Sequence, residues 1–158
     1  MEVRGTFSVS APVDFCWTFL KDPRTFSRCV PGCEEILSMD EHSFECIVVQ
    51  KVGIFKVRFQ GTTTIVEAQP VHLVRSVTKG LDTLTKTLME TGLELNLRTD
   101  SENSGVTLVD YAMTIRVVGR LAVLGEAVMR AKVRDISRQT ITSVQASVEK
   151  GYQGEDGR

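Results

Sequence analysis

Several features are scarce in this sequence of 158 residues, and each scarcity excludes a class of protein. Basic residues are not in excess, since 19 Lys and Arg stand against 20 Asp and Glu and the formal net charge is −1. Generic nucleic-acid-binding proteins are thereby excluded, because they carry a clear basic excess. Histidine occurs only as His42 and His72, which is too few for a histidine-rich metal site.

Long apolar runs are absent as well. The most apolar candidate, residues 117–129, is interrupted by Gly119, Arg120, Gly125 and Glu126, whereas a membrane span needs roughly 18 uninterrupted apolar residues. The first residues show no basic stretch followed by an apolar one, so no secretory signal is expected. We therefore expect a cytoplasmic protein, whose contact with the inner membrane would be peripheral.

Cysteine is limited to Cys16, Cys29, Cys33 and Cys46, which are expected to be free thiols in a reducing cytosol. The segment from Cys29 to Cys33 lacks the C-x2-C spacing of common zinc and redox sites, and no second close pair follows. We interpret these two cysteines as small apolar residues packed around a Pro-Gly turn. A local disulfide or metal site is the alternative, and no cofactor is expected.

The residues that are present alternate in ways that predict the order of elements. Residues 2–10 alternate as a half-buried strand, and residues after Pro12 have helical spacing until Asp22-Pro23 ends the helix. Asp22 is placed to cap a second short helix that runs to about Cys29. Six strands joined by short turns follow, which predicts a consecutively paired antiparallel sheet. Their expected ranges are 34–39, 44–51, 55–65, 71–78, 83–99 and 106–118.

From about Leu121 to Glu149 the apolar period becomes helical, and Gly151 is expected to end the helix. The predicted architecture is α+β, a curved antiparallel sheet of about seven strands wrapped around a long C-terminal helix in the order β-α-α-β6-α. We expect one domain over residues 1–150 and a disordered polar tail over residues 151–158. A curved sheet and a long helix leave space between them, so a cavity is expected.

Motifs spread over residues 7–125 resemble those of one family, the carbon monoxide dehydrogenase G-subunit (CoxG-like) family of the START-like, helix-grip (SRPBCC) superfamily. The motifs that carry the resemblance are Phe7, Ala11-Pro12, Trp17, Asp22-Pro23, Cys29-Val30-Pro31-Gly32-Cys33-Glu34, Lys51-Val52-Gly53, Phe59, Gly61, Thr107, Tyr111, Gly119-Arg120-Leu121-Ala122 and Leu124-Gly125. The series of Asp-Pro, Cys-x-Pro-Gly-Cys-Glu and Lys-Val-Gly is more specific than any one of its parts.

The resemblance implies the Bet v 1-like helix-grip fold and an accessory role beside molybdenum hydroxylases of the aerobic carbon monoxide dehydrogenase type. Members of the superfamily enclose hydrophobic ligands, and some are enzymes such as cyclases. Two departures matter here. The segment 83–92 is rich in threonine and leucine where the family often has glycine, and no apolar C-terminal extension follows, so membrane anchoring is not carried over.

The expected cavity would be lined from the strand faces and from the first half of the long helix. Tyr111 adds a hydroxyl that can orient a carbonyl or hydroxyl group, unless it is a core tyrosine bonded to the backbone. Methionine packs adaptably, which suits a flexible apolar ligand, although each methionine is also an ordinary core residue. The predicted ligand-binding residues are Phe55, Phe59, Leu93, Leu95, Tyr111, Met113, Leu124 and Val128.

No catalytic constellation is evident in the sequence. Asp82, Glu90 and Asp110 lie in or beside long strands, but alternation places Glu90 and Asp110 on the outer face. His42 lies in a polar turn and His72 at a strand start, as surface histidines do. We assign no catalytic residue and no metal ligand.

The long helix carries a basic stripe, formed by Arg130, Lys132, Arg134 and Arg138, that could meet an acidic partner or anionic headgroups, or simply be solvated. The sequence therefore favours a non-enzymatic protein that binds a lipid- or quinone-like molecule. Its partners would be that molecule and molybdenum hydroxylase subunits, not nucleic acid. The alternatives are a cyclase- or hydrolase-like enzyme that uses the same cavity, and a ligand-free interaction adaptor.

Overall fold

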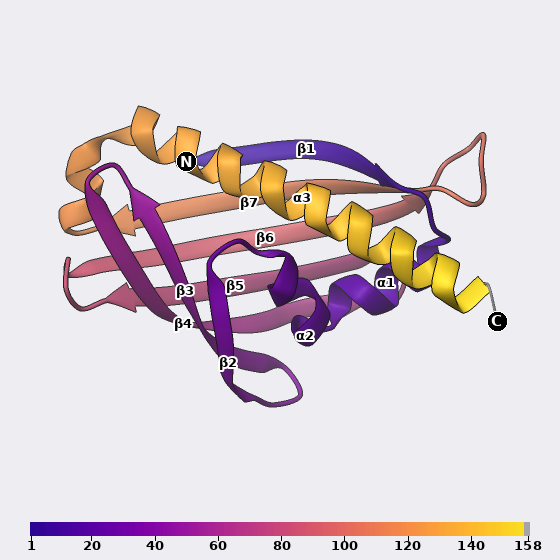
Figure 1. Ribbon diagram of the computed structural model, residues 1–158, viewed down its shortest axis with the longest axis horizontal. Helices are drawn as coiled ribbons and strands as arrows, with labels where there is room; N and C mark the ends of the chain where they lie inside the picture. The colour runs from indigo at the N-terminus through magenta and orange to yellow at the C-terminus, as the bar shows by residue number, and fades with distance from the viewer. Residues whose placement is uncertain (157–158) are drawn as a thin grey trace.

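Seven antiparallel strands form a single sheet within residues 1–156, the part of the chain that the computed structural model describes. Their order across the sheet is β1-β7-β6-β5-β4-β3-β2, so strands that follow one another from β2 to β7 pair directly and β1 pairs with β7 (Figure 1). The strands are β1 (Glu2–Val9), β2 (Cys33–Met39), β3 (Ser43–Val52), β4 (Phe55–Gln69), β5 (Leu73–Asp82), β6 (Thr87–Thr99) and β7 (Thr107–Val118). The predicted α+β class and helix-grip order are confirmed.

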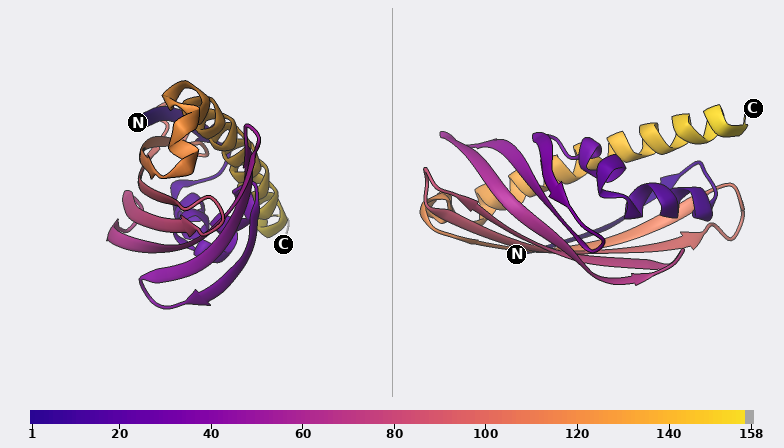
Figure 2. Two further views of the ribbon diagram at one scale, coloured as in Figure 1. Left: turned by 90° about the vertical axis from the view of Figure 1, so that its left-hand side faces the viewer. Right: turned by 90° about the horizontal axis from the view of Figure 1, so that it is seen from below.

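The helices lie on one side of this sheet. Between β1 and β2 the chain forms α1 (Val13–Lys21), α2 (Pro23–Phe26) and the 3-10 helix η1 (Ser27–Cys29). A second 3-10 helix, η2 (Arg120–Leu124), follows β7 and leads into α3 (Glu126–Asp156). Figure 2 shows that the sheet curves beneath α3, as the twist of antiparallel strands favours.

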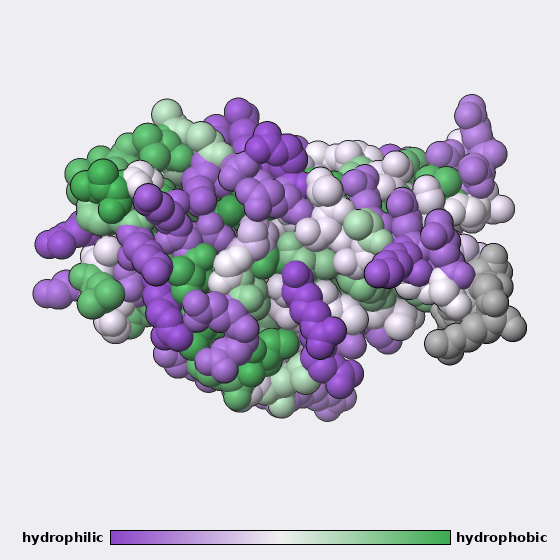
Figure 3. Space-filling view, viewed as in Figure 1, coloured by the Kyte–Doolittle hydropathy of each residue, from purple (hydrophilic) through white to green (hydrophobic). Residues whose placement is uncertain are grey.

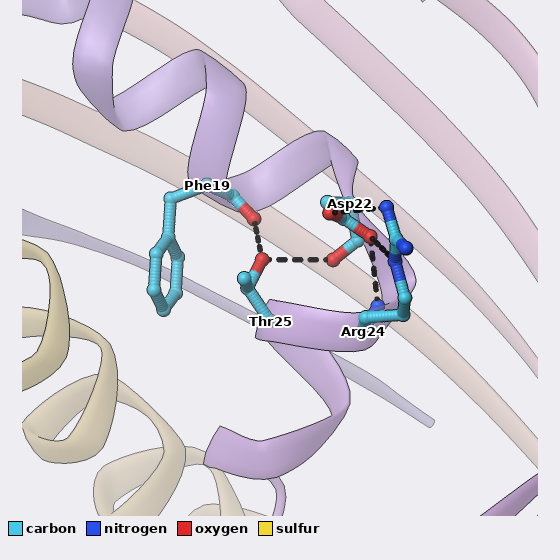
Figure 4. A network of polar contacts seen from close by, with 4 residues as sticks. All are labelled: Phe19, Asp22, Arg24 and Thr25. Carbon is cyan, nitrogen blue, oxygen red and sulfur yellow. Dashed lines mark hydrogen bonds and ion pairs between the residues drawn. The ribbon is translucent and has the colours of Figure 1, made fainter.

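The corner between α1 and α2 is fixed by a small polar network (Figure 4). The Asp22 carboxylate accepts a hydrogen bond of 2.9 Å from the backbone N–H of Arg24, and Pro23 occupies the first helical position of α2. The Thr25 hydroxyl donates to the carbonyl of Phe19 at 2.6 Å. These bonds confirm the predicted cap and set the angle at which α2 meets the sheet.

The connection between β5 and β6 differs from the prediction, because β5 continues through Gly80 to Asp82 and residues 83–86 form a turn. Gly80 lies within the strand because it pairs on both sides, with Gly61 of β4 and with Met89 of β6. The buried carboxylate of Asp82 then accepts hydrogen bonds from the backbone N–H of Leu84 and from the Thr85 hydroxyl. These bonds favour a turn where the Thr-rich sequence alone predicts a strand.

Helix α3 does not end at Gly151 as predicted but continues to Asp156. Tyr152 packs its ring edge-on against Phe15 of α1, with 5.4 Å between the ring centroids, and this contact extends the helix past the glycine. The last two positions of the predicted tail, 157 and 158, lie outside the described residues. No described helix is both long enough and apolar enough to cross a membrane.

The buried apolar residues of the described chain form two clusters at opposite ends of α3. The larger joins α1 and the C-terminal half of α3 to the sheet, and its members include Trp17, Leu97 and Val148. The smaller joins η2 and the start of α3 to the β3–β4 ribbon, and its members include Val57, Leu121 and Met129. The middle of α3 therefore lies over a part of the sheet that belongs to neither cluster.

Candidate ligand-binding cavity

A cavity of about 340 Å³ lies between the concave face of the sheet and α3. Its floor is formed mainly by strands β3 to β7, with Phe7 of β1 and Cys33 of β2 at its margins. Its roof is formed by Met129, Val133, Ile136 and neighbouring residues of α3. Residues of α1 and α2, among them Phe26, close one side. The volume falls within the range of about 300–1,000 Å³ that is typical of small-molecule sites.

The cavity exists because the middle of the sheet presents short side chains to the helix. Thr63, Thr78 and Thr91 are direct cross-strand partners and form a row across β4, β5 and β6. Gly61 and Gly80 form a second row beside them. These side chains are too short to fill the space beneath α3, whereas the larger residues at both ends do fill it.

Five of the eight predicted ligand-binding residues line this cavity: Phe59, Leu93, Leu95, Tyr111 and Met113. Phe55 and Leu124 do not line it, and both pack against the smaller core cluster. Val128 points away from the sheet and is 42% exposed.

The helical register explains the position of Val128. Gly125 adopts a φ of +88° and α3 begins only at Glu126, so the helix does not continue the turn that carries Leu121. Met129 and Val133 therefore face the sheet in place of Val128. The apolar period from residue 121 onward predicts one continuous helix. In the sequence, Gly125 alone marks the point where the helix direction changes.

Tyr111 lies flat over a neighbouring strand and lines the cavity. Its cross-strand partner is Gly5 of β1, and a Cβ at Gly5 would lie 2.4 Å from the tyrosine hydroxyl oxygen. Glycine at position 5 therefore makes room for the ring, as is common where an aromatic residue covers a glycine in a sheet. The ring of Phe7 is tilted against it, with 6.2 Å between centroids.

The cavity wall is poor in groups for acid–base chemistry. Among the described residues, no Asp, Glu or His lines it, and the charged side chains that do are Lys21 and Lys132. Cys33 and Cys46 also line the cavity, which the sequence did not indicate, and all four cysteines are free thiols. Burial raises the pKa of the Cys46 thiol to about 11, so this thiol is protonated at neutral pH.

The carboxylates that the sequence singled out have structural partners. Asp82 caps the turn after β5: its burial opposes ionisation, but hydrogen bonds from Thr85 outweigh that effect and lower its pKa. Asp110 faces outward and accepts from Arg98 and Thr6, and these hydrogen bonds lower its pKa. Glu90 is exposed on the outer face, as predicted. His42 and His72 are exposed as well.

Of the four basic residues predicted as a partner surface, Arg130, Arg134 and Arg138 recur every four residues along α3 and so lie on one side of it. Arg130 bonds to Glu126 and to the backbone carbonyl of Glu2, and Arg138 bonds to Asp135. Arg134 is exposed, while Lys132 lies at the edge of the cavity. Local pairing thus engages two of the four charges.

Comparison with known families identifies the chain. Residues 5–149 match the family described as the G subunit of carbon monoxide dehydrogenase (CoxG). The chain belongs to the CoxG family. No curated protein matches this CoxG chain.

Solved structures similar to this CoxG chain share its fold at low sequence identity. A conserved protein from Geobacillus kaustophilus has a TM-score of 0.86 at 16% identity, with 96% of this chain and 97% of that chain covered. The Zhui aromatase/cyclase from Streptomyces sp. R1128 has a TM-score of 0.64 at 18% identity, covering 95% and 94%. Protein Ms6760 from Mycobacterium smegmatis has a TM-score of 0.67 at 15% identity, covering 95% and 92%.

Proposed function

We propose that this CoxG protein is a non-enzymatic carrier that binds a hydrophobic small molecule, lipid- or quinone-like, between its sheet and α3. The cavity over the row of Thr63, Thr78 and Thr91 is the observation that carries this proposal. Its wall is mainly apolar, and burial of apolar ligand surface there supplies the binding free energy. Tyr111 and the threonine hydroxyls offer a few polar contacts for a carbonyl or hydroxyl group.

Binding is favoured over catalysis by the chemistry of the wall. A cyclase or hydrolase needs a group that moves protons near neutral pH, and the described lining offers neither a carboxylate nor an imidazole. The cavity disfavours the ligand-free adaptor. An unfilled space costs packing contacts, and in a protein that binds no ligand nothing offsets that cost.

We propose further that the carrier serves a molybdenum hydroxylase of the aerobic carbon monoxide dehydrogenase type in the cytoplasm. Membership of the CoxG family supports this role. Of the four basic residues predicted as a partner surface, Arg134 is exposed and forms no ion pair within the described chain, and it is our candidate for contact with an acidic hydroxylase surface. Retention of hydroxylase subunits on the immobilised protein, and their loss with Arg134→Glu, tests that contact.

Native mass spectrometry tests the ligand proposal most directly. We expect protein purified without detergent from its own host to carry a lipophilic species of defined mass, which organic solvent extracts. An exclusively ligand-free mass in repeated preparations would favour the adaptor instead.

A peripheral contact with a bilayer is proposed at the end of the molecule formed by η2 and two hairpin turns. There Ile54, Leu84 and Val123 are 88%, 81% and 83% exposed. The β3–β4 turn contacts η2 through Gly53 and Leu124. The β5–β6 turn lies next to η2 as well, since the Leu121 N–H donates to the hydroxyl of Thr87. Figure 3 shows apolar atoms gathered at this end. Exposed apolar side chains at the tips of turns are typical of surfaces that bind a membrane or another protein.

We expect Leu84→Asp to lower binding to vesicles of phosphatidylglycerol, because a charge at this tip opposes insertion below the headgroups. Cosedimentation measures the effect. Val66→Asp is the matched control, since Val66 is 58% exposed on β4 and lies outside these turns. Equal sedimentation of the two variants would place the membrane contact elsewhere.

A further inference from the structure

We infer that the ligand carries an anionic group, a carboxylate or a phosphate, and that this group binds in a groove of three lysines that adjoins the cavity. The inference rests on the proposed ligand-binding function and specifies the chemical class of the ligand as an anionic amphiphile. The groove, called the lysine groove below, is lined by Lys51, Lys56, Lys132, Gln50 and Gln139, together with the turn at Pro31-Gly32.

The lysine groove adjoins the cavity. Gln50 and Lys132 line both, one from β3 and the other from α3. Gln50 points inward from its strand and donates to the carbonyl of Pro31. An amphiphile can therefore place an apolar chain beneath α3 while its polar end remains in the groove.

Two of the lysine charges in the groove lie opposite each other and lower the stability of the sheet. Lys51 and Lys56 are direct cross-strand partners at the end of the β3–β4 ribbon. Like charges in this position destabilise a sheet, and neither position requires lysine for packing because both side chains are exposed. Lys132 brings a third positive charge from α3 to the same groove.

These charges are not neutralised within the part of the chain that the structure describes. The ion pairs found there all use arginine, and none includes Lys51, Lys56 or Lys132. No Asp or Glu lines the groove in that part of the chain. The nearest carboxylate along α3, Asp135, accepts from Arg138 and Gln139. Lys21, at the far side of the cavity, adds positive charge and again no carboxylate accompanies it in the lining.

Three ammonium groups around a site with two amide side chains form a receptor for an oxygen anion. Each ammonium can donate charge-assisted hydrogen bonds, which are stronger than those between neutral groups. A neutral headgroup would leave the three charges without a counter-charge. The geometry thus points to a fatty-acid-like or phosphate-bearing lipid.

The test compares two ligands that share one chain: oleate and oleyl alcohol, below their aggregation concentrations and at neutral pH. We expect oleate to bind about tenfold more tightly than oleyl alcohol by titration calorimetry, and this preference to shrink with added salt. The triple variant Lys51→Gln, Lys56→Gln, Lys132→Gln should lose the preference but still bind oleyl alcohol. The control variant Lys79→Gln, Lys86→Gln, Lys150→Gln removes the same charge outside the groove and should retain the preference.

Two results would overturn the inference and leave the proposed function intact: equal affinity for both ligands, or equal loss of preference in the control variant. Phosphate binding that depends on the three lysines, together with oleate binding that does not, would assign the groove to a free anion without an apolar chain. Binding of neither ligand, together with a ligand-free native mass, would instead contradict the proposed function itself. Thermal unfolding of the triple variant checks its fold, and we expect no loss of stability because a like-charged pair is removed.

Discussion

Thr91→Trp is expected to abolish binding of an apolar ligand while the protein remains folded. Thr91 lies in the row of short side chains beneath α3, so the indole ring would occupy the space that the ligand needs. Insertion of bulk into a well-packed core is destabilising, but here the ring enters a cavity. Titration with the neutral fluorophore phenylnaphthylamine measures the effect, and we expect an affinity loss of at least about tenfold.

Glu90→Trp provides the matched control, because Glu90 precedes Thr91 on the same strand and is exposed on the opposite face. Binding by this variant should equal that of the parent protein. The variants should also differ in native mass spectrometry, where only Thr91→Trp loses the extractable species. Undiminished fluorophore binding by folded Thr91→Trp protein would show that the ligand lies elsewhere.

Val148→Asp is expected to have the largest effect on stability. Val148 is fully buried in the larger core cluster and does not line the cavity, so an aspartate there would be a charge without solvent or partner. Burial of such a charge costs several kcal/mol, and we expect the free energy of unfolding to fall by about 4 kcal/mol. Urea denaturation followed by circular dichroism measures it.

Val128→Asp makes the same chemical change on the same helix and should be nearly neutral, within about 0.5 kcal/mol. The Val128 side chain is exposed, and a negative charge in the first turn of a helix is favourable. The pair therefore also tests the register of α3. Strong destabilisation by Val128→Asp would return that residue to the sheet-facing side, where the sequence pattern placed it.

Much of the fold follows from local patterns that the chain shows plainly. Alternation of inward and outward side chains indicates the faces of β4, β6 and β7, and Asp22-Pro23 marks the corner between two helices. Two boundaries do not follow from such patterns. Gly80 and Gly151 look like ends of elements in the sequence. In the structure, pairing of Gly80 with the strands on both sides continues β5, and the Phe15–Tyr152 contact accompanies the continuation of α3. Tertiary contacts override local propensity at both places.

The cavity residues were harder to predict because short side chains, which carry no hydrophobic pattern, create the cavity. Large inward residues such as Leu93 and Met113 are conspicuous in a strand pattern, and both line the cavity. Thr63, Thr78 and Thr91 do not stand out, although together they create the space. Their alignment depends on register across three strands, which only the folded structure supplies. The thiols of Cys33 and Cys46 reach the wall for the same reason.

The division of the core into two clusters has a kinetic consequence. Helix α3 is held to the sheet at both ends, and proteins open locally in units whose free energies lie well below that of global unfolding. Separation of the smaller cluster, around Leu121 and Met129, would lift one end of the helix while the larger cluster keeps the chain folded. For the proposed ligand we therefore expect the residence time to depend on how often this smaller cluster opens, and substitutions there to change the rate of release.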